Sequence, residues 1–161
     1  MSALTSLLSA EQILLDLEVS SKKRLFEQVS LLFENHRGVA RALVYDSLFA
    51  RERLGSTGLG HSVAIPHGRI KGLRDPAGAF LRLKTPVPFE SPDGNPVTLA
   101  FVLLVPEHAN QTHLDILSLL AEMFSDRDMR AKLSSETDAQ TVFELIANWQ
   151  PYAPNQRRAT G

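Results

Sequence analysis

Residues 55–69 read GSTGLGHSVAIPHGR, and the rest of the chain is interpreted from this stretch. The apolar run at 63–65 predicts a short strand, and Pro66 has no N–H group with which to continue a ladder of backbone hydrogen bonds. We therefore expect the strand to end there and His67 to emerge at an end of the sheet. Ligand sites of open α/β sheets favour strand ends, and Gly68 lets another backbone or a phosphate approach the imidazole closely. The stretch thus predicts an α/β fold with a reactive histidine.

Strand and helix patterns alternate on both sides of this stretch. The predicted strands are 13–19, 63–65, 77–85 and 97–105. Three helices are predicted at 22–36, 39–54 and 128–133, and the first of them should stop at Gly38. Two more helices should begin near Thr112, which can cap the first, and near Thr137, which has capping-box spacing. Strand 77–85 has one partly polar face, which carries Arg82 and Lys84. Strand 97–105 is apolar throughout, as is typical of a central strand buried on both faces. We expect a single α/β domain at 1–149, with a central mixed β-sheet flanked by α-helices, and a mobile tail at 150–161.

The composition excludes several classes of protein. A chain of 161 residues is long enough for one domain with a proper core, and the absence of cysteine excludes disulfides and thiolate sites. The net charge is −1 and the basic residues are scattered, which argues against nucleic-acid binding. The chain shows neither a signal-peptide pattern nor an apolar run of membrane-spanning length. We therefore expect a cytoplasmic protein without membrane insertion.

Four side chains are candidates for chemistry on an anionic group. An imidazole has a reference pKa of about 6.5, so His67 is largely neutral in the cytosol and has a free ring nitrogen, unless it is a core histidine bonded to backbone. His113 falls in the first turn of a predicted helix, where backbone N–H groups and the helix dipole favour an anion. Arg51 lies just before the glycine loop, which we define as residues 55–60. Arg69 is a weaker candidate, for a phosphoryl group or for partner docking.

Separate blocks of the sequence resemble enzyme IIA of the bacterial phosphotransferase system, in the mannitol/fructose and nitrogen-regulatory superfamily. These blocks are GSTGLG and VAIPHG around His67, Arg51-Glu52, LLVP at 103–106, and THLDILSLLA from Thr112. The likeness covers nearly the whole chain and is greatest to the nitrogen-regulatory type. The resemblance implies that His67 carries a phosphoryl group, that His113 faces it, and that Arg51 is the arginine of the active site.

The glycine loop has the spacing GxxGxG, so it is neither a dinucleotide fingerprint nor a P-loop. We expect Gly58 and Gly60 to shape a pocket for the phosphoryl group or the partner. The chain reads Gly60-His61-Ser62 where the family has Gly-Asn-Gly. Either His61 replaces that asparagine or it is merely exposed.

The leading hypothesis is a phosphocarrier that accepts a phosphoryl group from an upstream phosphocarrier protein. It would then regulate target proteins such as kinases or transporters, in nitrogen- or potassium-linked control, and it would need no cofactor and no metal. One alternative is a sugar-transport enzyme IIA that passes phosphate to a IIB domain. Another is a metal-dependent hydrolase using His61, His67, His108 and His113, although no HExxH pair supports it. The last is a binding module without chemistry.

Overall fold

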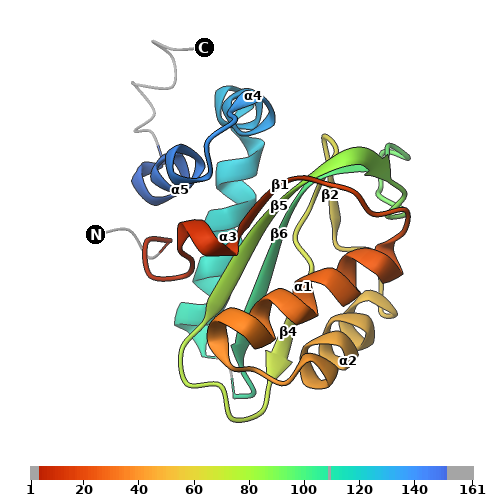
Figure 1. The fold of residues 1–161 in the computed structure, drawn as a ribbon, viewed down its shortest axis with the longest axis vertical. Helices are drawn as coiled ribbons and strands as arrows, with labels where there is room; N and C mark the ends of the chain where they lie inside the picture. Colours follow the sequence, from red (N-terminus) through yellow and green to blue (C-terminus); the bar gives the residue numbers. More distant parts are fainter. Residues whose placement is uncertain (1–3, 109, 152–161) are drawn as a thin grey trace.

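The strand β6 (Val97–Pro106) lies at the centre of a six-stranded sheet in the computed structural model, which describes residues 4–108 and 110–151 (Figure 1). On one side β6 pairs antiparallel with β5 (Ala77–Val87), and β5 pairs in parallel with β1 (Ile13–Leu17) at the edge. The strands predicted at 13–19, 77–85 and 97–105 are therefore confirmed, and the sheet is mixed as expected.

His67 does not emerge at an end of the sheet, and that expectation was wrong. β3 (Val63–Ala64) stops where predicted, but the chain returns to β6 at once as β4 (His67–Ile70), and both short strands run parallel to β6. The missing N–H of Pro66 only interrupts the ladder, because the Pro66 carbonyl still accepts the N–H of Leu103 at 2.9 Å. His67 is therefore the first residue of a strand and is paired with the middle of β6.

Helices cover both faces of the sheet (Figure 1). The first two helices pack on one face, and the last three pack on the other together with the N-terminal segment. The remaining elements are the 3-10 turn η1 (Ala10–Gln12), α1 (Lys22–Arg37), α2 (Arg41–Glu52), β2 (Gly58–Gly60) at the sheet edge beside β3, α3 (Gln111–Ser125), α4 (Arg127–Ser135) and α5 (Ala139–Asn148). All five predicted helices are present, and α1 ends at Gly38 in the left-handed conformation as predicted.

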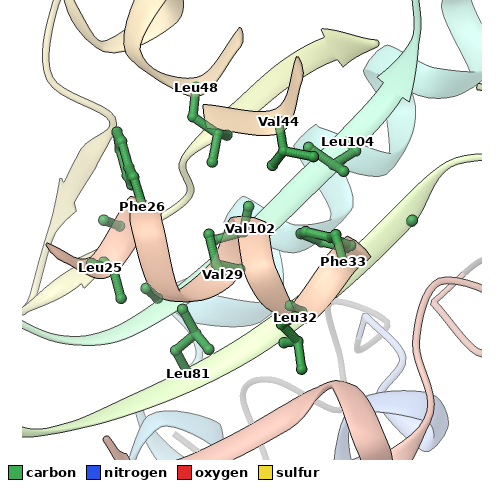
Figure 2. Packing of buried hydrophobic residues seen from close by; sticks show 14 of the residues in the cluster. Leu25, Phe26, Val29, Leu32, Phe33, Val44, Leu48, Leu81, Val102 and Leu104 are labelled. Atoms are coloured by element: carbon green, nitrogen blue, oxygen red, sulfur yellow. The ribbon is translucent and has the colours of Figure 1, made fainter. Parts of the chain in front are cut away.

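The side chains of β6 alternate between two hydrophobic cores. Ala100, Val102 and Leu104 contribute to the core under α1 and α2, whereas Leu99, Phe101 and Leu103 contribute to the core under α3, α4 and α5. Figure 2 shows the first core, with labelled side chains of α1 and α2 packed over Leu81, Val102 and Leu104. The continuous apolar run of β6 thus has the role that was predicted from it, since both of its faces are buried.

The partly polar face predicted for strand 77–85 is present, but one of its two polar side chains is buried. Arg82 is 7% exposed, because its guanidinium forms an ion pair with Asp16 (Nε–Oδ1 3.2 Å) and donates to the carbonyl oxygens of Leu133 and Glu136. A charged group can be buried when its donors are satisfied in this way. Only Lys84 on that face is exposed.

Two predicted helix caps are also wrong. α3 begins after Asn110 rather than after Thr112, and α5 begins after Asp138 rather than after Thr137. In both cases the side-chain oxygen of the true cap accepts the N–H of the third helical residue, which is the usual capping geometry.

No helix in the described ranges is both long enough and apolar enough to cross a membrane. The tail predicted at 150–161 falls, apart from its first two residues, outside the described residues.

Candidate functional site

The imidazole of His67 is half-buried, and a backbone carbonyl two residues earlier in the sequence fixes its orientation. Its Nδ1 lies 2.8 Å from the carbonyl oxygen of Ile65, and a carbonyl can only accept, so Nδ1 carries the proton. Burial is the largest influence on the pKa of His67 and lowers it below its ordinary value of 6.5. The charge of Arg51 also lowers this pKa, whereas the hydrogen bond to Ile65 and the charge of Glu52 raise it. The ring is therefore neutral at pH 7, with the lone pair of Nε2 available.

Arg51 lies in the last turn of α2, and a close contact between α2 and β4 sets its position. Gly68 is buried against Ser47, one turn earlier on α2, and a Cβ atom at residue 68 would collide with the Ser47 hydroxyl. That hydroxyl donates to the carbonyl of Arg69 at 2.8 Å and joins the two elements. The guanidinium of Arg51 donates to the Gly55 carbonyl at 2.7 Å, and its charge acts on His67. The expected close approach at Gly68 is thus made by a helix.

His113 is the third residue of α3 and takes part in the cap of its own helix. Its backbone N–H donates to the Asn110 side chain at 3.2 Å, and its Nδ1 accepts the backbone N–H of Asn110 at 3.2 Å. An imidazole whose Nδ1 accepts carries its proton on Nε2 when neutral. His113 therefore has an N–H donor at the far side of its ring.

These side chains meet at one cleft of about 780 Å³ between α2, β4 and the start of α3. Arg51, His67, Gly68, Arg69 and His113 all line it, together with exposed leucines of the two helices. A smaller hollow of about 210 Å³ shares Arg51 and His67 and is lined by Gly58. The structure therefore brings six of the seven predicted site residues together.

The seventh residue, Gly60, is not brought to either hollow. It ends β2, and the two-residue turn of His61 and Ser62 follows, both with positive φ (55° and 62°) as in a type I′ hairpin. The backbone N–H of His61 donates to Asp93 at 3.0 Å, and its side chain is exposed. His61 lies at the start of the β6 ladder, whereas His67 is paired further along it, so His61 takes no part in orienting that ring.

The metal-dependent alternative has no geometric support among the described residues. In 4–108 and 110–151 no group of three or more His, Cys, Asp or Glu side chains is placed to hold a metal ion. Of the four histidines considered for such a site, only His67 and His113 line the cleft.

Two residues of the site were not found from the sequence. Glu52 was noted only as part of a motif, yet its carboxylate is buried and accepts hydrogen bonds from the glycine loop. Asn110 was missed because Thr112 was predicted as the cap, although an asparagine three residues before a histidine has the spacing of a capping box. That spacing was the signal for Asn110.

Comparison with known proteins gives one family. The family profile described as "Phosphoenolpyruvate-dependent sugar phosphotransferase system, EIIA 2" matches residues 6–149. A nitrogen regulatory protein of Bradyrhizobium diazoefficiens is 40% identical over 144 residues, which cover 89% of this chain and 94% of that protein. A nitrogen regulatory protein of Pseudomonas aeruginosa is also 40% identical, over 154 residues that cover 91% of this chain and 96% of that protein. The crystal structure of nitrogen regulatory protein IIA-Ntr from Neisseria meningitidis has a TM-score of 0.86 at 49% identity, covering 90% of this chain and 99% of that one. This chain therefore belongs to the EIIA 2 family of the phosphoenolpyruvate-dependent sugar phosphotransferase system.

Proposed function

We propose that this protein is a cytoplasmic phosphocarrier that accepts a phosphoryl group on Nε2 of His67 and regulates other proteins by contact. The observation that carries the proposal is the neutral His67 ring, with Nδ1–H held by a carbonyl and Nε2 free, in a cleft shared with Arg51 and His113. Family membership supplies the reaction class, since this system moves phosphoryl groups from phosphoenolpyruvate.

The transfer is a displacement at phosphorus. The lone pair of His67 Nε2 forms the new N–P bond, the bond from phosphorus to the donor breaks, and the donor leaves with that electron pair. His67 keeps its Nδ1 proton, which stays hydrogen-bonded to Ile65. Such reactions depend on positioning and on charge stabilisation rather than on covalent help from the protein.

Arg51 and His113 supply that stabilisation in this proposal. The Arg51 guanidinium presents a positive charge that already acts on His67, and its bond to Gly55 limits its movement. His113 presents Nε2–H to the oxygens of the phosphoryl group, because its Nδ1 is already used as an acceptor. His67 bonds to phosphorus, and the other two side chains hold the oxygens.

Exposed apolar side chains around the cleft support a protein partner as the donor. Among the described residues, five large hydrophobic side chains are exposed: Leu31, Leu43, Leu54, Leu59 and Leu114. All except Leu31 line one of the two hollows that contain His67. Arg69 is exposed on the same rim and adds a positive charge for an upstream phosphocarrier protein. An apolar rim with a few charges is typical of a protein interface.

Regulation of nitrogen- or potassium-linked targets, such as kinases or transporters, is the role we infer from the nitrogen regulatory relatives. The alternative within the family is a sugar-transport IIA that passes its phosphate to a IIB domain. The two roles use the same cleft and differ in the acceptor.

The test is to incubate the protein with phosphoenolpyruvate and the general phosphotransferase proteins and to measure its intact mass. We expect one added phosphoryl group, and none in His67→Ala. His108→Ala is the matched control, since His108 is an exposed histidine outside both hollows, and it should be phosphorylated as the wild type. Absence of the added mass in the wild type would favour a binding module without chemistry. Rapid loss of the group to an added IIB domain would favour the transport role.

A further inference from the structure

Glu52 is a buried carboxylate at the end of α2 for which the transfer step above has no use. Its side chain is 4% exposed. One carboxylate oxygen accepts the backbone N–H of Thr57 at 3.1 Å and lies 3.0 Å from Nζ of Lys22, and the other accepts the Thr57 hydroxyl at 2.7 Å. The carboxylate thus joins the end of α2 to the glycine loop and to the start of α1.

Two further hydrogen bonds connect this carboxylate to the reacting histidine. The carbonyl of Thr57 accepts the N–H of Ile65 at 3.0 Å, and the carbonyl of Ile65 accepts Nδ1–H of His67 at 2.8 Å. The acceptor that fixes the His67 tautomer is therefore held by a loop residue, and that residue is held by Glu52. A buried network with all of its members bonded gives a rigid arrangement.

We propose that Glu52 is a positioning residue for phosphoryl transfer: by holding Thr57 it holds the Ile65 carbonyl, which keeps the proton of His67 on Nδ1 and leaves Nε2 free. The inference rests on the proposed function, because it concerns the readiness of His67 to attack phosphorus. Glu52 lines neither hollow and makes no hydrogen bond to the imidazole, so it holds the ring's tautomer through the loop, and its charge also acts on the ring.

Lys22 makes this arrangement compatible with an anionic substrate. The charge of Glu52 reaches His67, since it raises the pKa of that ring, and an unpaired carboxylate there would repel a phosphoryl group. The ammonium of Lys22 lies 3.0 Å from Glu52 and 4.8 Å from the centre of the Phe89 ring, and its side chain is 16% exposed. The buried carboxylate is thus paired with an ammonium, which also lies 3.6 Å from the exposed carboxylate of Glu90, so the loop is held without an unpaired buried negative charge behind the nucleophile.

Two substitutions separate hydrogen bonding from charge. In Glu52→Gln the carbonyl oxygen can face Lys22 and the Thr57 N–H, and the amide NH₂ can donate to the Thr57 hydroxyl, which also accepts. That variant keeps the loop in place and removes only the charge. Glu52→Ala removes both. Positioning therefore requires that Glu52→Ala be impaired and that Glu52→Gln resemble the wild type.

The first readout is the ¹⁵N NMR spectrum of His67, which distinguishes the Nδ1–H tautomer from the Nε2–H tautomer and needs no phosphate. We expect the Nδ1–H form in the wild type and Glu52→Gln, and a mixture in Glu52→Ala. The second readout is the single-turnover rate of phosphate uptake from a phosphorylated donor, which should fall about 10- to 100-fold in Glu52→Ala, because small misplacements of reacting groups have effects of that order.

The matched control is Asp16→Asn, which removes the carboxylate partner of the buried Arg82 far from the cleft. It should lower the melting temperature without changing the His67 spectrum or the rate. If Glu52→Ala is not folded by circular dichroism, Thr57→Ala, which removes only the hydroxyl bond to Glu52, should change the same two readouts in the same direction and by less, and unchanged readouts would count against the proposal.

Three results would overturn the proposal. These are an unchanged tautomer and rate in Glu52→Ala, equal losses in Glu52→Ala and Glu52→Gln, and equal effects in Glu52→Ala and Asp16→Asn. If the wild type takes up no phosphate, the proposed function fails, while the NMR comparison still tests whether Glu52 fixes the His67 ring.

Discussion

The two histidines of the cleft are held in different ways. His67 begins β4, which pairs with the central strand β6, and its ring is bonded to the Ile65 carbonyl. A chain of hydrogen bonds behind this carbonyl ends at a buried ion pair. His113 lies in the first turn of a surface helix, and one backbone N–H from the exposed Asn110 fixes its ring. The first is positioned by tertiary structure, and the second is positioned within four consecutive residues.

This difference suits the roles proposed for the two side chains. A nucleophile must present one atom in one direction, so its tautomer and ring plane are best fixed by a packed core. A donor to phosphoryl oxygens has more freedom, because a phosphoryl group offers three acceptors. We therefore expect substitutions on the His67 side to affect the reaction more than equivalent substitutions on the His113 side.

The largest expected effect is that of His67→Ala, which should abolish phosphate uptake. The wild-type species should be a phosphoramidate, stable in alkali and labile in acid, because the new bond joins nitrogen to phosphorus. Intact mass measured before and after acid treatment checks both statements. Uptake by His67→Ala at the wild-type rate would place the acceptor elsewhere.

The second effect is that of Arg51→Ala and of His113→Ala, each of which should slow uptake without abolishing it. Loss of one donor or charge in a preorganised site costs about 3 to 4 kcal/mol, or roughly 10² to 10³ in rate, and less where solvent reaches the group. Single-turnover kinetics measure the loss. Arg53→Ala is the matched control, because Arg53 follows the same helix but lines neither hollow. Rates unchanged in both variants, with the fold intact, would remove both residues from the mechanism.

The sequence predicted the parts of the site that depend on local patterns. The apolar run of β6 and the helix before Gly38 are contained in short stretches, and the structure agrees with both. The motif around His67 is equally short, and His67 lines one cleft with Arg51 and His113. The return of the chain to β6 after Pro66 was missed, because it depends on pairing with a strand more than thirty residues away. The burial of Glu52 was missed for a similar reason, since its partner Lys22 lies on another helix.

The third effect concerns the cap of α3 and is smaller. Asn110→Ala removes the side chain that accepts the N–H of His113, so the first turn should fray and His113 should lose its fixed orientation. A cap is worth about 1 kcal/mol, so the rate of uptake should fall by about fivefold at most. Asn110→Asp keeps the acceptor and should behave as the wild type. A loss in Asn110→Ala as large as that in His113→Ala would show that the cap does more than orient this ring.

The fourth effect is on pH dependence and again separates the two sides of the cleft. Burial lowers the pKa of His67, so at pH 6.5 a larger fraction of this ring is neutral in the folded protein than in an unfolded chain, where half is protonated. As the pH falls, the uptake rate should therefore decline at a lower pH than an unperturbed imidazole of pKa about 6.5 would give, and the stability of the fold should fall as the pH drops below about 6.5 toward the lowered pKa of His67. In Arg51→Ala the pKa of His67, followed by NMR, should rise, because the charge of Arg51 lowers it. A fall in pKa in that variant would contradict the placement of Arg51.

The smallest effect on transfer, expected to be none, is that of the His61-Ser62 turn between β2 and β3, because these two residues line neither hollow. His61 and Ser62 both have positive φ, a conformation that glycine adopts without strain and that asparagine tolerates well. The double substitution His61→Asn and Ser62→Gly gives the pair preferred in type I′ turns and keeps the backbone N–H that donates to Asp93. It should stabilise the fold by about 1 kcal/mol, which for a chain of this size raises Tm by roughly 2 to 4 °C. Thermal unfolding measures the gain, and single-turnover uptake should be unchanged. A lower Tm would show that the present turn is not strained, and a changed rate would show that this hairpin communicates with His67 after all.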